Sequence, residues 1–154
     1  MKRAVLFFLF SLFATTSCTR GKIYEQFADI KGNIWNRFDV IEFDVNVEDI
    51  SPAYDFYVVF RFMEQFPLDA VDIEFSFTTP SGETRSADQK IEFRDKDGNF
   101  QGDGMGDLWD VKRLVRQGYK FTEPGICKVE ISSTMSYIDL PGIMQIGLIV
   151  RKDH

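Results

Sequence analysis

The sequence predicts an all-β protein, an antiparallel β-sandwich of immunoglobulin-like or jelly-roll-like kind, in a single domain. Three observations predict this class: apolar and polar residues alternate with a period of two, turn-forming residues separate the alternating rows, and phenylalanine is abundant, with 16 in the chain. A period of two sets one side of each strand against a core and the other side in water. The alternating rows are 41–47, 54–62, 71–78, 127–132 and 144–150.

Short segments rich in proline, glycine, aspartate and asparagine lie between these rows and favour chain reversal. Strands of five to nine residues at such intervals are typical of two packed sheets, and the phenylalanines suit a thick core between them. No internal repeat or linker is seen, which indicates one domain. The turn segments are 49–53, 80–82, 97–99, 123–125 and 140–142.

Two segments are less regular. Residues 22–35 carry too many aromatic and aliphatic side chains for a disordered tether, so we expect them to pack along the sandwich as an edge strand. Residues 107–117 have apolar residues near helical spacing and predict either one or two helical turns or a bent strand.

The amino terminus resembles a lipoprotein signal peptide spanning residues 1–17. A positive start precedes an apolar run at 4–14, which as a helix would span only about 16 Å, whereas a transmembrane helix needs roughly 20 apolar residues. Small residues at 15–17 lead to Cys18, which we expect to be lipidated, leaving a mature domain of residues 18–154. The alternative is an ordinary signal peptide in which Cys18 is coincidental.

The charge and the scarce reactive residues exclude several functions. The net charge is −6, and removal of the leader with Lys2 and Arg3 makes it more negative, which argues against nucleic-acid binding. The only histidine is the last residue, His154, so a catalytic triad or a histidine metal site is not expected. With Cys18 lipidated, Cys127 has no disulfide partner, and its place in an alternating row predicts a buried thiol. We expect no enzyme activity and no cofactor.

Five aspartates and four glycines crowd residues 94–110. Their carboxylates suggest a calcium loop, but Phe100 stands where an EF-hand has its glycine, and turn-capping aspartates explain the same residues without a metal. A second alternative is a carbohydrate-binding lipoprotein with a stacking platform of Tyr57, Trp35 and Trp109; each of these rings fits a core or strand position equally well.

Three blocks in this order resemble the gliding motility lipoprotein GldH family of the Bacteroidetes. The first, 24–39, reads YEQFADIKGNIWNRFD and the second, 95–110, reads DKDGNFQGDGMGDLWD. The third, 140–152, reads LPGIMQIGLIVRK, with Gln145 where an acidic residue is expected. The resemblance covers nearly the whole chain from the region of Cys18 onward.

The resemblance implies a non-enzymatic, structural or accessory component of the gliding machinery in the cell envelope. It implies a membrane anchor through acyl chains on Cys18 and protein partners. Residues 19–22 are neutral or basic, whereas surface-exported lipoproteins of this phylum carry acidic residues there, so a periplasm-facing domain is expected. Loops on a rigid scaffold often carry function, so we expect the glycine-rich loop to contact a partner. The alternative is that its glycines only permit positive φ in a tight turn. The candidate partner-binding loop comprises Asp97, Gly98, Gly102, Gly104, Gly106 and Asp107.

Overall fold

The computed structural model describes residues 21–153, so the leader and Cys18 lie outside the described residues. Eleven strands and one short 3₁₀ helix make up this part of the chain. The elements are β1 (Lys22–Asp29), η1 (Lys31–Asn33), β2 (Ile34–Asn36), β3 (Ile41–Val47), β4 (Tyr54–Met63), β5 (Ala70–Thr78), β6 (Thr84–Glu92), β7 (Asp103–Met105), β8 (Leu108–Tyr119), β9 (Gly125–Ser133), β10 (Asp139–Pro141) and β11 (Ile143–Lys152).

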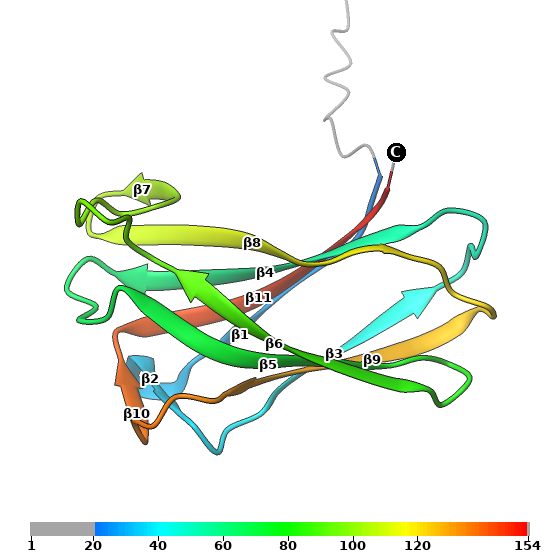
Figure 1. Ribbon diagram of the computed structural model, residues 1–154, viewed down its shortest axis with the longest axis horizontal. Coiled ribbons are helices and arrows are strands. Elements are labelled where there is room, and N and C mark those ends of the chain that lie inside the picture. The colour runs from blue at the N-terminus through cyan, green and yellow to red at the C-terminus, as the bar shows by residue number, and fades with distance from the viewer. Residues whose placement is uncertain (1–20, 154) are drawn as a thin grey trace, which may run out of the picture.

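The strands form two facing layers and a small third sheet (Figure 1). One layer has the order β1-β11-β4-β8-β7, the other has the order β3-β9-β5-β6, and β10 pairs with β2 alone. All pairings are antiparallel. The predicted all-β antiparallel sandwich is therefore confirmed.

The order of the strands is that of a jelly roll. Partners nest along the chain from the outside inward: β1 pairs with β11, β3 with β9, β4 with β8, and β5 with β6. Except at the β5–β6 hairpin, successive long strands thereby fall into opposite layers, as in a long hairpin rolled into two sheets. Of the two sandwich types that the sequence left open, this topology is the jelly roll.

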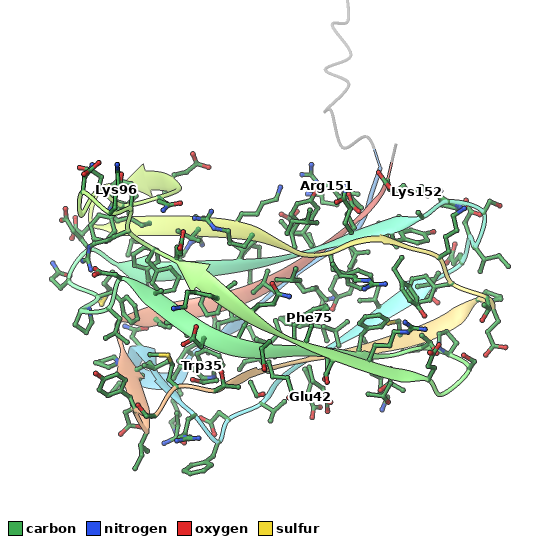
Figure 2. All side chains as sticks on the ribbon, in the orientation of Figure 1. Trp35, Glu42, Phe75, Lys96, Arg151 and Lys152 are labelled. Atoms are coloured by element: carbon green, nitrogen blue, oxygen red, sulfur yellow. The ribbon has the colours of Figure 1, made fainter. Side chains whose placement is uncertain are left out.

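Aromatic rings from both layers fill the space between the sheets, and Figure 2 shows Phe75 in this interior. Phe56 of β4 stacks on Phe77 of β5, with centroids 5.4 Å apart, and Phe62 stacks on Phe93 at 4.6 Å. Burying each phenylalanine contributes about 1.5–3 kcal/mol, so this aromatic cluster is a main source of the stability of the fold. The predicted phenylalanine core is confirmed.

The outer face of the five-stranded sheet is less polar than simple alternation implies. Val59 and Ile149 point outward yet are only 4% and 6% exposed. The ring of Phe27 lies against this face, over Gly147, where a Cβ atom would come within 2.5 Å of the ring. The ammonium of Lys112 sits 4.5 Å from the centre of the Tyr57 ring. Long side chains thus cover their apolar neighbours.

Strands make up most of both irregular segments. β1 is an edge strand of the five-stranded sheet, as expected for the first part of residues 22–35. Residues 107–117 fall almost wholly within β8, which settles the open choice in favour of the bent strand; its pairing with β4 shifts register twice, on either side of Phe56. Within residues 21–153, no helix is long and apolar enough to cross a bilayer.

Candidate functional site

The glycine-rich loop begins with a turn organised by Asp95. Its Oδ1 atom accepts backbone hydrogen bonds from Asp97 and Asn99, both at 2.9 Å, and its Oδ2 accepts one from the Asn99 side chain at 3.2 Å. The bonds from Asn99, with that from Asp97, lower the pKa of Asp95. Gly98 completes the turn with a φ of +84°. Asp95 therefore caps a turn, while Asp97 points into solvent.

Gly102 and Gly104 are required by close packing. Gly102 has a φ of +115°, and a Cβ atom there would lie 2.2 Å from the carbonyl oxygen of Asp110. A Cβ atom on Gly104 would lie 2.9 Å from the ring of Trp109. A side chain at Gly102 would meet fixed backbone, and one at Gly104 would require the Trp109 ring to shift, so these glycines let the loop and β7 lie against β8.

Gly106 forms the tight turn between β7 and β8. Met105 pairs with Leu108, which leaves Gly106 and Asp107 as a two-residue hairpin loop. Gly106 has a φ of +65°, the sign that primed hairpin turns require at their first central position. The backbone carbonyl of Asp107 accepts a hydrogen bond from Glu64 N at 2.8 Å, which ties this turn to the end of β4.

An aromatic contact fixes the loop to the core. Phe100 packs 4.8 Å from the Trp109 ring and 5.7 Å from the Phe62 ring. The guanidinium of Arg94 lies 4.3 Å from the centre of the Phe100 ring and donates to the carbonyl oxygen of Phe66 at 2.9 Å. The loop is therefore a packed element that holds its exposed residues in place.

A polar network beside the loop crosses four strands of the outer face. Arg61 donates to both carboxylate oxygens of Asp110, at 2.8 and 2.7 Å, and to Gln145 at 2.9 Å. Gln145 in turn donates to Asp29 at 2.6 Å. The hydrogen bonds to Asp110 raise the pKa of Arg61. Sequence reasoning missed this network; the signal available was Arg61, the one basic residue among the outward positions of its row.

A hollow of about 380 Å³ lies between this network and β7. Leu108 and Met105 line it together with Arg61, and Met105 is 78% exposed. The structure thus brings Gly104 to the hollow and leaves Asp97 and Gly98 at the separate Asp95 turn. All six predicted loop residues are exposed; they are Asp97, Gly98, Gly102, Gly104, Gly106 and Asp107. The loop offers carboxylates and a thioether on a fixed frame, which suits contact with another protein.

The three aromatic residues considered as a sugar platform do not share a surface. Trp35 is fully buried, with its ring 5.9 Å from that of Phe60. Trp109 is half-buried under Phe100, and its Nε1 atom is buried without a hydrogen-bond partner in residues 21–153. Tyr57 lies on the outer face under Lys112.

The remaining candidates for a chemical site are a cysteine, a histidine and the acidic side chains. Cys127 is buried as predicted, and desolvation raises the pKa of its thiol to about 12, so it is a poor nucleophile. His154 lies outside the described residues. In the described part of the chain, no group of three or more His, Cys, Asp or Glu side chains is placed to hold a metal ion.

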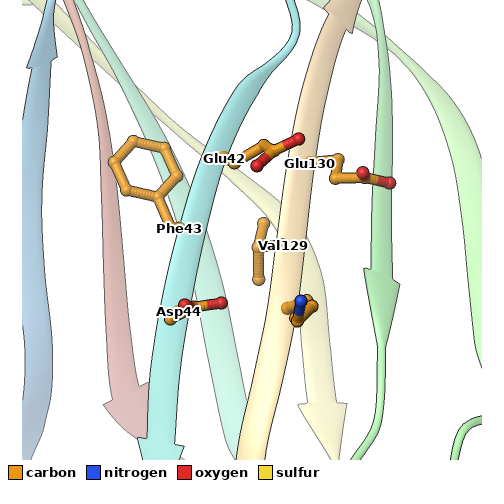
Figure 3. A pocket seen from close by; sticks show the side chains of 6 residues that line it. Glu42, Phe43, Asp44, Val129 and Glu130 are labelled. Atoms are coloured by element: carbon orange, nitrogen blue, oxygen red, sulfur yellow. The ribbon is translucent and has the colours of Figure 1, made fainter.

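A shallow hollow of about 270 Å³ lies on the outer face of the four-stranded sheet, over β3 and β9. Glu42 stands directly across from Glu130 (Figure 3), and Asp44 pairs with Lys128 in the register of β3 with β9. Like charges facing each other across two strands are unfavourable, but both side chains reach solvent here. The hollow is an acidic, open surface.

Comparisons with known proteins agree with the three sequence blocks. The family model described as GldH lipoprotein matches residues 22–150. A gliding motility lipoprotein GldH homolog of Christiangramia forsetii is 22% identical, covering 97% of this chain and 95% of its own length. The gliding motility lipoprotein GldH of Flavobacterium johnsoniae is 25% identical, covering 77% of this chain and 73% of its own. No solved structure matches this chain. The chain therefore belongs to the GldH lipoprotein family, whose curated relatives are gliding motility lipoproteins.

Proposed function

We propose that this lipoprotein serves the gliding machinery as a non-catalytic structural component that contacts another envelope protein through its glycine-rich loop. Membership of a lipoprotein family supports a membrane-anchored protein of the cell envelope. The names of the two curated relatives support the link with gliding. The finer points of this proposal are the anchor at Cys18, a domain facing the periplasm, and the contact surface.

The contact surface is inferred from an exposed loop that is packed against the core. Phe100 packs against Trp109 and β7 pairs with β8, so the loop is tied to the core while Met105 stays 78% exposed. A surface held in its bound shape loses little conformational freedom on association. Methionine side chains adapt readily to an apolar partner surface. The loop beside Arg61 and Asp110 therefore has the properties of a preorganised protein-binding site.

The test uses point substitutions that spare the core. Deleting residues 97–106 would remove Phe100 and disturb the packing on Phe62, so Asp97→Ala with Met105→Ser is the sharper variant. Purification from intact envelopes after crosslinking should lose a partner with this variant. The control is Glu74→Ala, an exposed position on the outer face of the other sheet. Unchanged partners in the loop variant would overturn the contact surface.

The anchor and its side are tested separately. Mass spectrometry of the intact protein should show acyl chains on Cys18 and a chain that begins at this residue. Substituting Cys18→Ser should release the domain from the membrane fraction. Acyl chains contribute roughly 0.8 kcal/mol for each buried CH₂, so membrane attachment depends on them. Protease added to whole cells should leave the domain intact; cleavage would place it on the cell surface instead.

A further inference from the structure

Large apolar side chains gather on one small part of the surface. Ten such side chains are exposed within residues 21–153, and half of them come from two short segments around β2 and β10. Exposed apolar residues that occur singly are normal, whereas a contiguous group marks an interaction site. The apolar patch comprises Ile34 (47% exposed), Phe38 (74%), Val40 (47%), Tyr137 (55%) and Ile138 (57%).

The two segments lie side by side although about a hundred residues separate them. β10 pairs with β2 through Leu140 and Trp35, and just beyond this pairing Arg37 N donates to the carbonyl oxygen of Ile138 at 2.8 Å. The segments that carry Phe38 and Ile138 are therefore adjacent. A hollow of about 510 Å³ adjoins Phe38 and Val40, and charged residues such as Asp39 and Glu42 also line it.

The apolar patch is held in a fixed conformation. Trp35 and Leu140 are buried in the core at 0% and 1% exposure, which anchors both short strands. The Trp35 indole donates to the carbonyl oxygen of Asp39 at 3.0 Å, and Phe38 N donates to the side chain of Asn36 at 3.0 Å. The apolar side chains thus stand outward because the structure holds them there.

The apolar patch lies at the end of the domain opposite the point where the chain enters. Lys152 N donates to the carbonyl oxygen of Gly21 at 2.7 Å, so the entry point adjoins the end of β11, near the labelled Arg151 and Lys152 in Figure 2. From there β1 runs eight residues, or about 26 Å, toward η1 and β2. Figure 1 shows β2 and β10 at the far end from the start of β1.

We propose that the apolar patch is a docking site for a second envelope protein whose contact surface is aliphatic and aromatic. The inference rests on the proposed lipid anchor at Cys18: only residues 19–21 separate it from β1, and the extended chain from Cys18 to Lys22 spans at most about 14 Å. The entry end is thereby held at the membrane, and the opposite end points into the envelope space. The apolar patch therefore lies away from the anchoring bilayer, where it can contact another protein.

This docking site is separate from the glycine-rich loop. The loop belongs to β7 and β8 of the five-stranded sheet, whereas the apolar patch lies on β2 and on the segments that flank β2 and β10. The chain can therefore join two proteins at once, which is the property expected of a structural component. The two surfaces can also be disabled independently.

The test places a photo-crosslinking phenylalanine analogue at position 38 of the full-length lipoprotein in its own bacterium. The matched control carries it at Ile126, another exposed apolar residue, 47% exposed, on β9. Irradiation should join position 38, and not position 126, to one protein of defined mass. That protein, once purified, should bind the full chain about tenfold or more weakly after Phe38→Ser, with no change after Ile126→Ser.

Four results would overturn the proposal: a crosslink to a second copy of this chain, a crosslink to lipid alone, equal crosslinking from both positions, or unaltered binding by Phe38→Ser. Urea unfolding of Phe38→Ser establishes that the variant is folded. Intact mass of the same preparation reports the acyl chains, so failure of the anchor is recognised independently of the crosslinking result. Met105→Ser, which tests the loop, should leave the crosslink at position 38 unchanged.

Discussion

Arg61 binds Asp110 through two parallel hydrogen bonds, from Nε to Oδ1 at 2.8 Å and from Nη2 to Oδ2 at 2.7 Å. Both side chains are about one-third exposed, so solvent weakens the ion pair, while the two-point geometry strengthens it. We expect Arg61→Met to lower the free energy of unfolding by about 1 kcal/mol, measured by urea denaturation.

A double-mutant cycle isolates the interaction free energy between Arg61 and Asp110 from their contacts with other residues. Combining Arg61→Met with Asp110→Asn should cost about 0.5–1 kcal/mol less than the sum of the two single changes, because the second change finds no partner left to lose. Additive effects would mean that Arg61 acts mainly through Gln145, to which it donates at 2.9 Å.

Gly102 and Gly98 both have positive φ but differ in the space around them. A Cβ atom on Gly102 would meet the Asp110 carbonyl at 2.2 Å, while one on Gly98 would meet nothing within 4 Å. Gly98→Ala should therefore cost about 1–2 kcal/mol, the strain of the left-handed conformation alone. Gly102→Ala should cost more and detach β7 from β8. Faster amide exchange of residues 103–105 in Gly102→Ala alone would show this, and equal effects of both changes would contradict it.

The sandwich was predictable because each long strand carries its own period-two signal. Phe56, Val58, Phe60 and Phe62 alternate along β4, and all four are fully buried. The nesting of strand pairs that defines a jelly roll has no such local signal, since it depends on which rows pair across the chain. β8 was ambiguous because its two register shifts against β4 break the alternation.

The candidate surfaces were only partly predictable, because they too depend on which distant parts of the chain lie together. The glycine-rich loop stands out in the sequence by composition, yet its glycines have different roles that depend on Asp110 and Trp109 across the hairpin. No sequence pattern predicts the apolar patch, because β2 and β10 have three residues each, too few to show a period. The patch forms because β2 and β10, about a hundred positions apart in the sequence, pair with each other.

Asp49 makes the free energy of unfolding depend on pH in the acid range. Its carboxylate accepts hydrogen bonds from Ser51 N at 2.9 Å and Lys152 Nζ at 3.0 Å, and the backbone bond is the main cause that lowers its pKa to about 2. The unfolded carboxyl has a pKa near 3.8, so its contribution to stability is present above that pH and is lost as the pH falls from 3.8 to about 2.

Asp49→Asn should therefore unfold with a shallower dependence on pH below 4 than the unaltered chain. Urea denaturation across pH 2–5 measures this, and Asp44→Asn, at an exposed carboxylate on β3, is the control. An unchanged slope in Asp49→Asn would mean that its hydrogen bonds persist in the unfolded chain.

Cys127 gives the opposite pH dependence in alkali. Burial raises the pKa of its thiol from 9.0 to about 12, so the unfolded chain releases this proton first as the pH rises. Its contribution to stability is therefore present below pH 9 and is lost between pH 9 and about 12. In a chain carrying Cys18→Ser, where Cys127 is the only thiol, a disulfide reagent should react at pH 8 only after urea unfolds the protein. Rapid reaction of the native chain would show that β9 opens readily and that Cys127 is not held in the core.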